Sequence, residues 1–233
     1  MNQNDFIESL KLLNISVDEQ RIQQLEKYYQ LLIEYNKVMN LTGIIEHDEV
    51  YLKHFYDSLT IAKIINLNNE ISLCDIGTGA GFPGIVLKIF YPHLKVILID
   101  SLNKRINFLN TVIRELKLEN IEAIHCRIEE YGTFNREKFD VVTARAVAST
   151  NQLLEYAIPI VKKDKYFIAM KGKNEDSKSY QNALKKLDTI EDDKVSFKLP
   201  IEKSDRLLIK FKKISSTDLK YPRKFSEIKN KSL

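Results

Sequence analysis

The stretch Ile71-Ser-Leu-Cys-Asp-Ile-Gly-Thr-Gly-Ala-Gly-Phe-Pro-Gly84 holds four of the seven glycines of this 233-residue chain. A short apolar run ends at Asp75, the glycines follow, and a helix is expected from about Pro83. Glycine lets the backbone come close to a ligand, and the start of the following helix offers free N–H groups. A plain turn needs only one or two glycines. The stretch therefore predicts a site for a nucleotide-type cofactor.

Downstream of this stretch, strand-like and helix-like runs alternate. The sequence predicts strands at 71–76, 95–100, 121–125, 139–144 and 165–170, and helices at 82–91, 103–117, 149–162 and 175–187. Such alternation is typical of a parallel sheet with helices on both faces. Two more strands, near 194–199 and 206–212, are separated only by a loop, so they should form an antiparallel edge.

Upstream, residues 1–66 are predicted to form a helical extension, and residues 67–233 the main body. Ser16 and Glu19 have the spacing of a capping box, and apolar residues then recur at helical intervals. A break is expected at Asn40–Gly43. A second helix should run from about Asp48 to Ile65.

The composition, 44% hydrophobic and 29% charged, is that of an ordinary globular protein. The chain has no apolar run of membrane-spanning length and no signal peptide, so we expect a cytoplasmic protein without membrane attachment. Cys74 and Cys126 lie in apolar runs and are predicted to be reduced core residues. The four histidines lack metal-ligand spacing, so no metal site is expected.

The net charge of +4 is unevenly distributed. Residues 1–70 carry 6 Lys/Arg and 11 Asp/Glu, whereas residues 71–233 carry 30 and 21. A basic body suggests a polyanionic partner. A Lys-rich composition that follows an AT-rich genome explains the same numbers equally well.

The segment Gly79–Gly84 matches the G-x-G-x-x-G pattern, which NAD-binding proteins also carry. Asp75 favours S-adenosylmethionine, because a carboxylate there can meet the methionine ammonium but would repel a pyrophosphate. Asp100, at the end of the second strand, can accept hydrogen bonds from ribose hydroxyls and fits either cofactor. Seven strands with an antiparallel finish suit a Rossmann-like class I methyltransferase sheet, and no residues remain for a dehydrogenase's substrate domain.

The run Asp75-Ile-Gly-Thr-Gly-Ala-Gly-Phe-Pro-Gly-Ile85 closely resembles the signature of the bacterial 16S ribosomal RNA (guanine-N7) methyltransferases, the glucose-inhibited division protein B family. Other matching elements follow in the family's order over nearly the whole chain. They are Asn40–Thr42, His54–Leu59, Asp100-Ser101 with Lys104-Arg105 and Phe108-Leu109, Arg127 with Glu129, Thr143–Ala146, Lys171-Gly172 and Tyr221–Lys224.

The resemblance implies methyl transfer from S-adenosylmethionine to N7 of one guanine in small-subunit rRNA. It also implies that Gly77, Phe82, Ile128, Glu129 and Arg145 line the cofactor site. We add Asp75, Gly79 and Asp100 from the residues themselves. The chain departs from the family after Tyr221-Pro-Arg, where Phe225–Leu233 replaces the usual glycine and prolines.

Guanine N7 already has a free lone pair, so its methylation needs positioning and no general base. The sequence lacks the Asn/Asp-Pro-Pro-Tyr motif of amine methylation and the Pro-Cys nucleophile of C5 methylation. Arg145 and Lys171, after the fourth and fifth strands, are the expected positioning residues. A structural salt bridge between Arg145 and an acid such as Glu129 is the alternative. His54, Asp57 and Ser58 make a poor hydrolase triad. The N-terminal helices are expected either to cover the cofactor cleft, with His54 or Asn40 near it, or to form a satisfied polar interface with the body.

The expected RNA contacts are basic positions in the body: Lys104, Arg105, Lys171, Arg223 and Lys224. For Lys104 and Arg105 a solvated helix face is an equally good interpretation. Lys210, Lys212, Lys213 and Lys220 add to the same charge. We expect a monomer that binds 16S rRNA or the small ribosomal subunit. The alternatives are a small-molecule methyltransferase, an RNA-binding module without activity and an NAD-dependent oxidoreductase.

Overall fold

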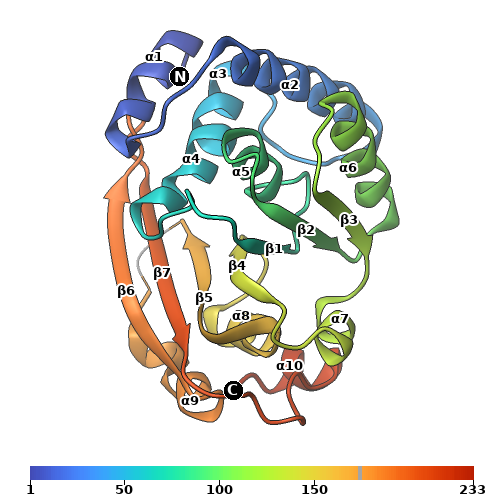
Figure 1. The fold of residues 1–233 in the computed structure, drawn as a ribbon, viewed down its shortest axis with the longest axis vertical. Helices are drawn as coiled ribbons and strands as arrows, with labels where there is room; N and C mark the ends of the chain where they lie inside the picture. Colours follow the sequence, from blue (N-terminus) through green and yellow to red (C-terminus); the bar gives the residue numbers. More distant parts are fainter. Residues whose placement is uncertain (173–174) are drawn as a thin grey trace.

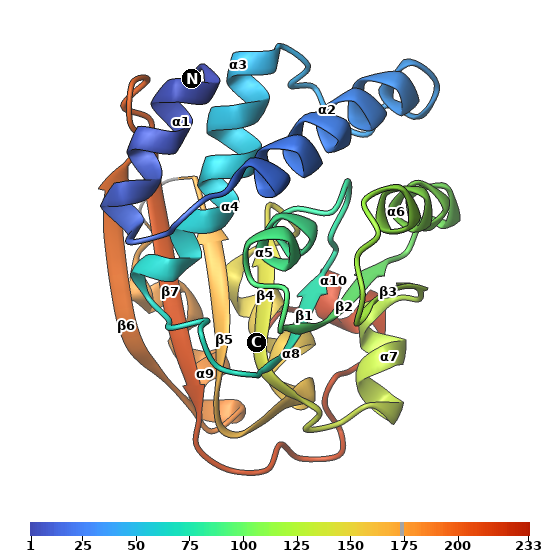
Figure 2. The ribbon, with the colours of Figure 1, turned by 45° about the horizontal axis from the view of Figure 1, so that its top comes forward.

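A seven-stranded sheet in the order β3-β2-β1-β4-β5-β7-β6 runs through the computed structural model, which describes residues 1–172 and 175–233 (Figures 1 and 2). Neighbouring strands from β3 to β5 are parallel, and β7 runs antiparallel to both β5 and β6. This is the predicted architecture, with the antiparallel pair at one edge. The strands are β1 (Ser72–Ile76), β2 (Lys95–Asp100), β3 (Ile121–His125), β4 (Phe139–Arg145), β5 (Val161–Lys171), β6 (Thr189–Lys198) and β7 (Asp205–Lys213).

Helices cover both faces of the sheet, with α2, α5 and α6 on one side and α8, α9 and α10 on the other (Figures 1 and 2). The strands alternate accordingly: Leu73 and Ile168 face the first core, Cys74 and Phe167 the second. The helices outside the extension are α5 (Gly84–Phe90), α6 (Asn103–Glu115), α7 (Ile128–Phe134), α8 (Thr150–Ala157), α9 (Gln181–Lys186) and α10 (Phe225–Asn230).

The N-terminal extension packs on the α5–α6 side and shares its core. Leu25, Leu32 and Phe55 are buried in one hydrophobic cluster with Ile85 and Phe108 of the body. The extension contains α1 (Gln3–Leu10), α2 (Glu19–Met39), α3 (His47–Val50), a π-helical turn (Tyr51–Tyr56), α4 (Asp57–Leu59) and a 3₁₀ turn (Thr60–Lys63).

Several predicted boundaries are wrong for local reasons. The N-cap of α2 is Asp18, whose side chain accepts a hydrogen bond from Arg21 N, so Ser16 and Glu19 form no capping box. The predicted helix 48–65 changes from α to π to 3₁₀ geometry. The helix α7 was not predicted, and β6 begins five residues before the expected start at Lys194.

The two cysteines carry free thiols, but only Cys74 is fully buried; Cys126 is half-buried at the edge of a cavity. Within the described ranges, no helix is long and apolar enough to cross a membrane. No group of three or more His, Cys, Asp or Glu side chains among the same residues is arranged to hold a metal ion.

Candidate cofactor site and the neighbouring cavity

The glycine loop between β1 and α5 has a backbone that other residues would adopt only with strain. Gly77, Gly79 and Gly81 have φ values of 63°, 62° and 100°. At Gly84 the constraint is space, because a Cβ would lie 2.3 Å from Leu98 Cδ2. A Cβ at Gly79 would meet no atom of the described residues within 4 Å. The loop thus presents an open backbone surface at Gly79.

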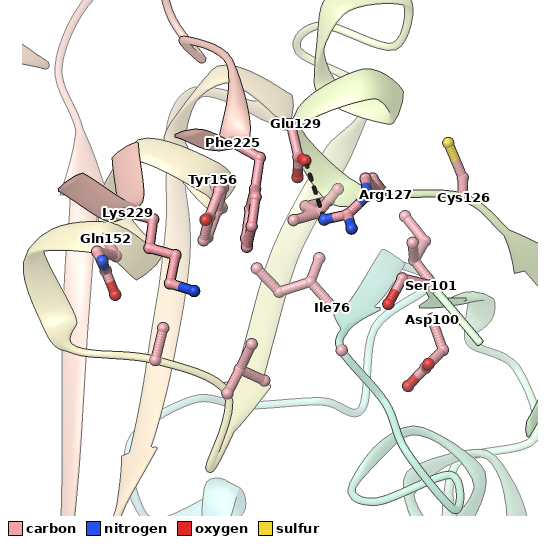
Figure 3. A pocket seen from close by; sticks show the side chains of 15 residues that line it. Ile76, Asp100, Ser101, Cys126, Arg127, Glu129, Gln152, Tyr156, Phe225 and Lys229 are labelled. Carbon is pink, nitrogen blue, oxygen red and sulfur yellow. Dashed lines mark ion pairs between the residues drawn. The ribbon is translucent and has the colours of Figure 1, made fainter. Parts of the chain in front are cut away.

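A cavity of about 310 Å³ opens beside this loop, where the carboxyl ends of β1 to β4 meet (Figure 3). Four predicted residues line it together: Gly77, Asp100, Ile128 and Glu129. Parallel strands place their carboxyl ends at one edge of a sheet, and ligands bind there in this class of fold. Arg127, Tyr156 and Phe225 also line the cavity. None of them was predicted as a cofactor residue.

Asp100 is buried at the end of β2 and holds the loop in place. Its Oδ2 accepts hydrogen bonds from Gly79 N (3.0 Å) and from Arg105 Nη1 (3.0 Å), and its Oδ1 accepts one from Leu102 N (3.0 Å). A carboxylate has about four acceptor positions, so one stays available for a ribose hydroxyl. The structure corrects the prediction for Arg105, because its guanidinium is paired with Asp100.

Glu129 is buried against the same cavity at the first turn of α7. Its Oε1 has no hydrogen-bond partner among the described residues, and the nearest cation is Arg127 Nη1 at 3.7 Å (Figure 3). A buried acceptor without a donor costs free energy. A ligand that brings an amino or hydroxyl donor would remove that cost.

Asp75 does not face the cavity. Its Oδ2 accepts hydrogen bonds from Thr78 Oγ1 (2.6 Å) and Gly84 N (2.9 Å), which tie the two ends of the glycine loop together. Burial raises the pKa of this carboxyl to about 6, although both hydrogen bonds act in the opposite direction. Its Oδ1 has no partner in the described part of the chain. The structure thus gives Asp75 a loop-bracing contact and no exposed surface for direct ligand contact.

Phe82 also lies away from the cavity lining, contrary to the expectation from the resemblance. It sits in an aromatic cluster with Tyr28 (ring centroids 5.3 Å apart) and with His54, which stacks on it at 4.5 Å. The Tyr28 hydroxyl donates to Ala80 O in the loop. Phe82 therefore links the glycine loop to the N-terminal helices.

Arg145, at the end of β4, is bound to the extension. Its Nη1 donates to Asp57 Oδ2 (3.1 Å) and Lys53 O (3.2 Å), and its Nη2 lies 3.3 Å from His54 Nδ1. Arg145 therefore forms a salt bridge, which was the alternative considered for it, but its partner is Asp57 instead of Glu129. Because a guanidinium only donates, His54 Nδ1 accepts and its Nε2–H donates to Thr42 Oγ1 (2.9 Å).

The environment of His54 keeps it neutral. Burial, helped by the Arg145 charge, lowers the pKa of His54 to about 3. Asp57 is held from a second side by Arg206 Nε at 2.9 Å. The carboxylate thus joins β4, β7 and the extension through two arginines.

A second cavity of about 360 Å³ lies beside this network. Arg145, Lys171 and Arg206 line it, together with His54 and Asp57. The chain turns sharply at Ala146, whose φ is 57°, so that Arg145 borders the second cavity while Val147 borders the first. The two cavities are neighbours on either side of the residues that follow β4.

The side chains of the remaining predicted RNA contacts differ in their exposure and in the hydrogen bonds that they already make. Lys171 Nζ donates to Ala148 O (3.0 Å) and lies 3.5 Å from Glu175 Oε2. Lys104 is exposed and donates to Met39 O at the end of α2 (2.9 Å). Lys224 is exposed at the start of α10.

Arg223 is bound to the buried carboxylate of Glu155, so most of its hydrogen-bonding capacity serves the fold; its predicted RNA contact stays a prediction. Lys213 is a core residue that donates to Ile158 O and Val161 O. Lys213 is fully buried and therefore has no cation to offer to RNA.

The residues around the first cavity fit an adenosyl group. The acceptor position left on Asp100, and Glu129 Oε1, which accepts no hydrogen bond from the described residues, could make polar contacts; Gly79 lies in the adjoining loop but outside the cavity lining. Ile76, Ile128 and Phe225 supply apolar ones. Asp57, Arg206 and Phe225 have their partners far away in sequence, so no local pattern could have assigned them to these cavities.

Comparison with known proteins places the chain in a family. The model of GidB, rRNA small subunit methyltransferase G, matches residues 21–207. A relative named "Ribosomal RNA small subunit methyltransferase G" from Lysinibacillus sphaericus is 48% identical over 228 residues, covering 96% of each chain. Its namesake from Bacillus subtilis is 45% identical and covers 96% of this chain and 95% of its own.

Solved structures agree on the fold. A SAM-dependent methyltransferase from Aquifex aeolicus aligns with a TM-score of 0.55 at 17% identity, over 76% of this chain and 97% of its own. TYW2 from M. jannaschii in complex with AdoMet aligns with a TM-score of 0.52 at 17% identity, over 63% and 71%. At such identities the likeness concerns the class I methyltransferase fold alone. With the family model matched over most of its length and relatives covering nearly all of it, the chain belongs to the rRNA small subunit methyltransferase G family.

Proposed function

We propose that this protein transfers a methyl group from S-adenosylmethionine to N7 of a guanine in 16S ribosomal RNA. The observation that carries the proposal is the pair of neighbouring cavities at the carboxyl edge of the sheet, one with acceptors for an adenosyl group and one lined by cations. Family membership supplies the substrate class. When bound, S-adenosylmethionine supplies an electrophilic methyl group on a sulfonium.

The first cavity is the proposed cofactor site. Asp100 and Glu129 would hold the hydroxyl and amino groups of the adenosyl half, and the open backbone at Gly79 would let the ligand approach the loop, whereas the Val147 side chain fills the space beside Gly77. Asp75 would act indirectly, by bracing the loop that carries both glycines. Phe82 and Arg145 would fix the position of that loop against the extension.

The second cavity is the proposed site of the target guanine. Arg145 and Lys171 are the positioning residues, and Arg145 has the donors to bind guanine O6. N7 needs no deprotonation, so the site has only to hold the base in line with the methyl group. His54 suits this role as a fixed neutral wall, because both its ring nitrogens are engaged by Thr42 and Arg145.

Approach of the RNA would depend on positive charge around the second cavity. Lys53, Arg145, Lys171 and Arg206 line it. Lys104 and Lys224 are exposed and would add phosphate contacts. We further propose that the protein acts as a cytoplasmic monomer on the small subunit or its RNA.

The test mixes purified protein and labelled S-adenosylmethionine with small subunits that lack the modification. We expect label in 16S rRNA, and borohydride reduction followed by aniline should cleave the RNA at the labelled guanine, as it does at N7-methylguanine. Large subunits serve as the control. Label at another atom, or in large subunits only, would contradict the proposal.

Substitution of Lys171 tests the acceptor site separately. Lys171→Ala should lower kcat/KM for the subunit about tenfold or more, while the Kd of S-adenosylhomocysteine stays unchanged. If Lys171→Ala instead weakened S-adenosylhomocysteine binding and left the KM for the subunit unchanged, Lys171 would belong to the cofactor site.

A further inference from the structure

One wall of the first cavity comes from the far end of the chain. Most of its lining lies between Ile76 and Tyr156, at the carboxyl ends of the strands and on α7 and α8. Phe225 and Lys229 come from the last helix, α10 (Figure 3).

Phe225 is partly exposed at the start of α10. Its relative exposure is 40%, and its ring lies 4.5 Å from the Arg127 guanidinium carbon. Arg127 is the residue next to Ile128 and Glu129 on the cavity wall. Figure 3 shows Phe225 and Tyr156 close to Ile76 around the same space. An aromatic surface thus stands beside the unpartnered acceptor of Glu129.

A buried ion pair fixes α10 in this position. Arg223 N and Nε donate to Glu155 Oε1 (3.0 and 2.7 Å), and Nη2 donates to Oε2 (2.6 Å). The Glu155 side chain is fully buried, so its charge requires this partner. Arg223 Nη2 also donates to Lys231 O (3.0 Å), which joins the two ends of α10.

The flanks of the segment are anchored as well. Ile228 and Leu233 lie in the core on the α8 side of the sheet. Arg136 donates to the carbonyl oxygens of Tyr221 and Asp218 before the helix begins. A Cβ at Gly132 in α7 would lie 3.2 Å from Pro222 Cγ, so the segment rests closely on α7. The helix α10 is therefore packed against the rest of the protein and forms a fixed wall of the cavity.

We propose that α10 forms part of the cofactor site, with Phe225 as the aromatic surface that packs against the adenine ring of S-adenosylmethionine. The inference rests on the proposed function and deepens it, because it assigns α10 a role in cofactor binding. A planar base gains from packing on an aromatic side chain. The amino group of adenine would at the same time provide the donor that Glu129 lacks.

Calorimetric titration of the full chain with S-adenosylhomocysteine tests the proposal. Phe225→Ala should raise the Kd about tenfold, because base–aromatic packing is lost. Phe225→Tyr keeps the ring and should stay within about twofold of wild type. Adenosine alone should lose affinity by the same factor as S-adenosylhomocysteine, since the contact lies in the half that they share.

Phe134→Ala is the matched control, because Phe134 is 84% exposed on α7 and lines neither cavity. It should leave the Kd unchanged, and circular dichroism should show all variants folded. A Kd within twofold of wild type for Phe225→Ala would overturn the inference, whether or not rRNA affinity falls. Failure of the wild-type protein itself to bind S-adenosylhomocysteine would instead overturn the proposed function.

Discussion

Arg105 was predicted to bind RNA, but a hydrogen bond to Asp100 points to a structural role for its side chain. In the sequence it follows Lys104 at the start of a predicted helix, and this position suggests a contact with an RNA phosphate. In the structure its guanidinium donates to Asp100, an acid that lines the first cavity, whereas Lys104 donates to the end of α2. Two adjacent cations therefore serve two different parts of the molecule.

Arg105→Gln should therefore raise the Kd of S-adenosylhomocysteine about tenfold, in line with the loss of a hydrogen bond to a charged group. Lys104→Gln, one position away, should not change it. Calorimetry on both variants provides the measurement. Loss of rRNA affinity in Arg105→Gln with an unchanged Kd for S-adenosylhomocysteine would restore the RNA role.

Asp75 should leave a signature in the pH dependence of stability. Its folded pKa of about 6 lies above the ordinary value of 3.8, so between these pH values the folded state keeps a proton that the unfolded state has released. Stability from this group is present below about pH 4 and is lost as the pH rises through 6. In Asp75→Asn that loss should be absent.

Urea unfolding at a series of pH values measures the effect. The stability difference, Asp75→Asn minus wild type, should increase from pH 4 to pH 6 by up to about 1.4 kcal/mol per pH unit and then level off. His54 titrates in an overlapping range in both proteins and cancels in the difference. A flat difference curve would show that Asp75 ionises normally.

Of the predicted residues that line the first cavity, Asp100 was expected from its place at the end of the second strand. Gly77, Ile128 and Glu129 were expected from the family resemblance. The partners of Arg145, Arg105 and Arg223 could not be predicted, because ion pairing depends on which acid the folded chain brings near. Glu155 and Arg223 are 68 residues apart.

At the scale of elements, the helix that carries His54 and Asp57 is the most irregular one. The sequence pattern predicts a single helix, but residues Tyr51–Tyr56 form a π turn and Thr60–Lys63 a 3₁₀ turn. Inserted turns of this kind re-aim side chains and concentrate at functional sites. Here the π turn includes His54 and is followed directly by Asp57, the residues that meet Arg145. The spacing of apolar residues predicts a helix, but it does not show where the helix changes from α to π or 3₁₀ geometry.

The start of α2 offers a test of the corrected cap. Asp18→Ala removes the side chain that accepts from Arg21 N and should cost about 1 kcal/mol, or a fall in Tm of about 2–4 °C. Ser16→Ala should leave the Tm unchanged, and Asp18→Asn should retain most of the stability. A larger loss for Ser16→Ala than for Asp18→Ala would favour the capping box predicted from sequence.

At the scale of the whole molecule, the extension and the body share one core. Leu32 of α2 is fully buried in the cluster that includes residues of α5, α6 and the sheet. Tyr28 reaches from α2 to the glycine loop, and Arg145 reaches from β4 to the extension. We therefore expect residues 1–66 to unfold together with residues 67–233.

Leu32→Ala should lower the stability of the entire protein by about 2–5 kcal/mol in one transition. Far-UV and tyrosine near-UV circular dichroism should give the same midpoint. Leu12→Ala, whose side chain is 70% exposed on the extension, is the control and should shift neither. Two separate transitions in Leu32→Ala would mean that the extension melts on its own.

Two lysines inside the molecule have a practical consequence for chemical labelling. Lys88 and Lys213 are almost completely buried, and their ammonium groups donate to backbone carbonyls of neighbouring segments. Burial lowers the pKa of both amines in the folded protein, and exposure would return them to the ordinary reactivity of lysine. An acylating reagent would modify the surface lysines first and reach these two only when the structure opens. Their acylation rates would thus report, within a single mass-spectrometric experiment, how often α5 and the β5–β7 edge come apart.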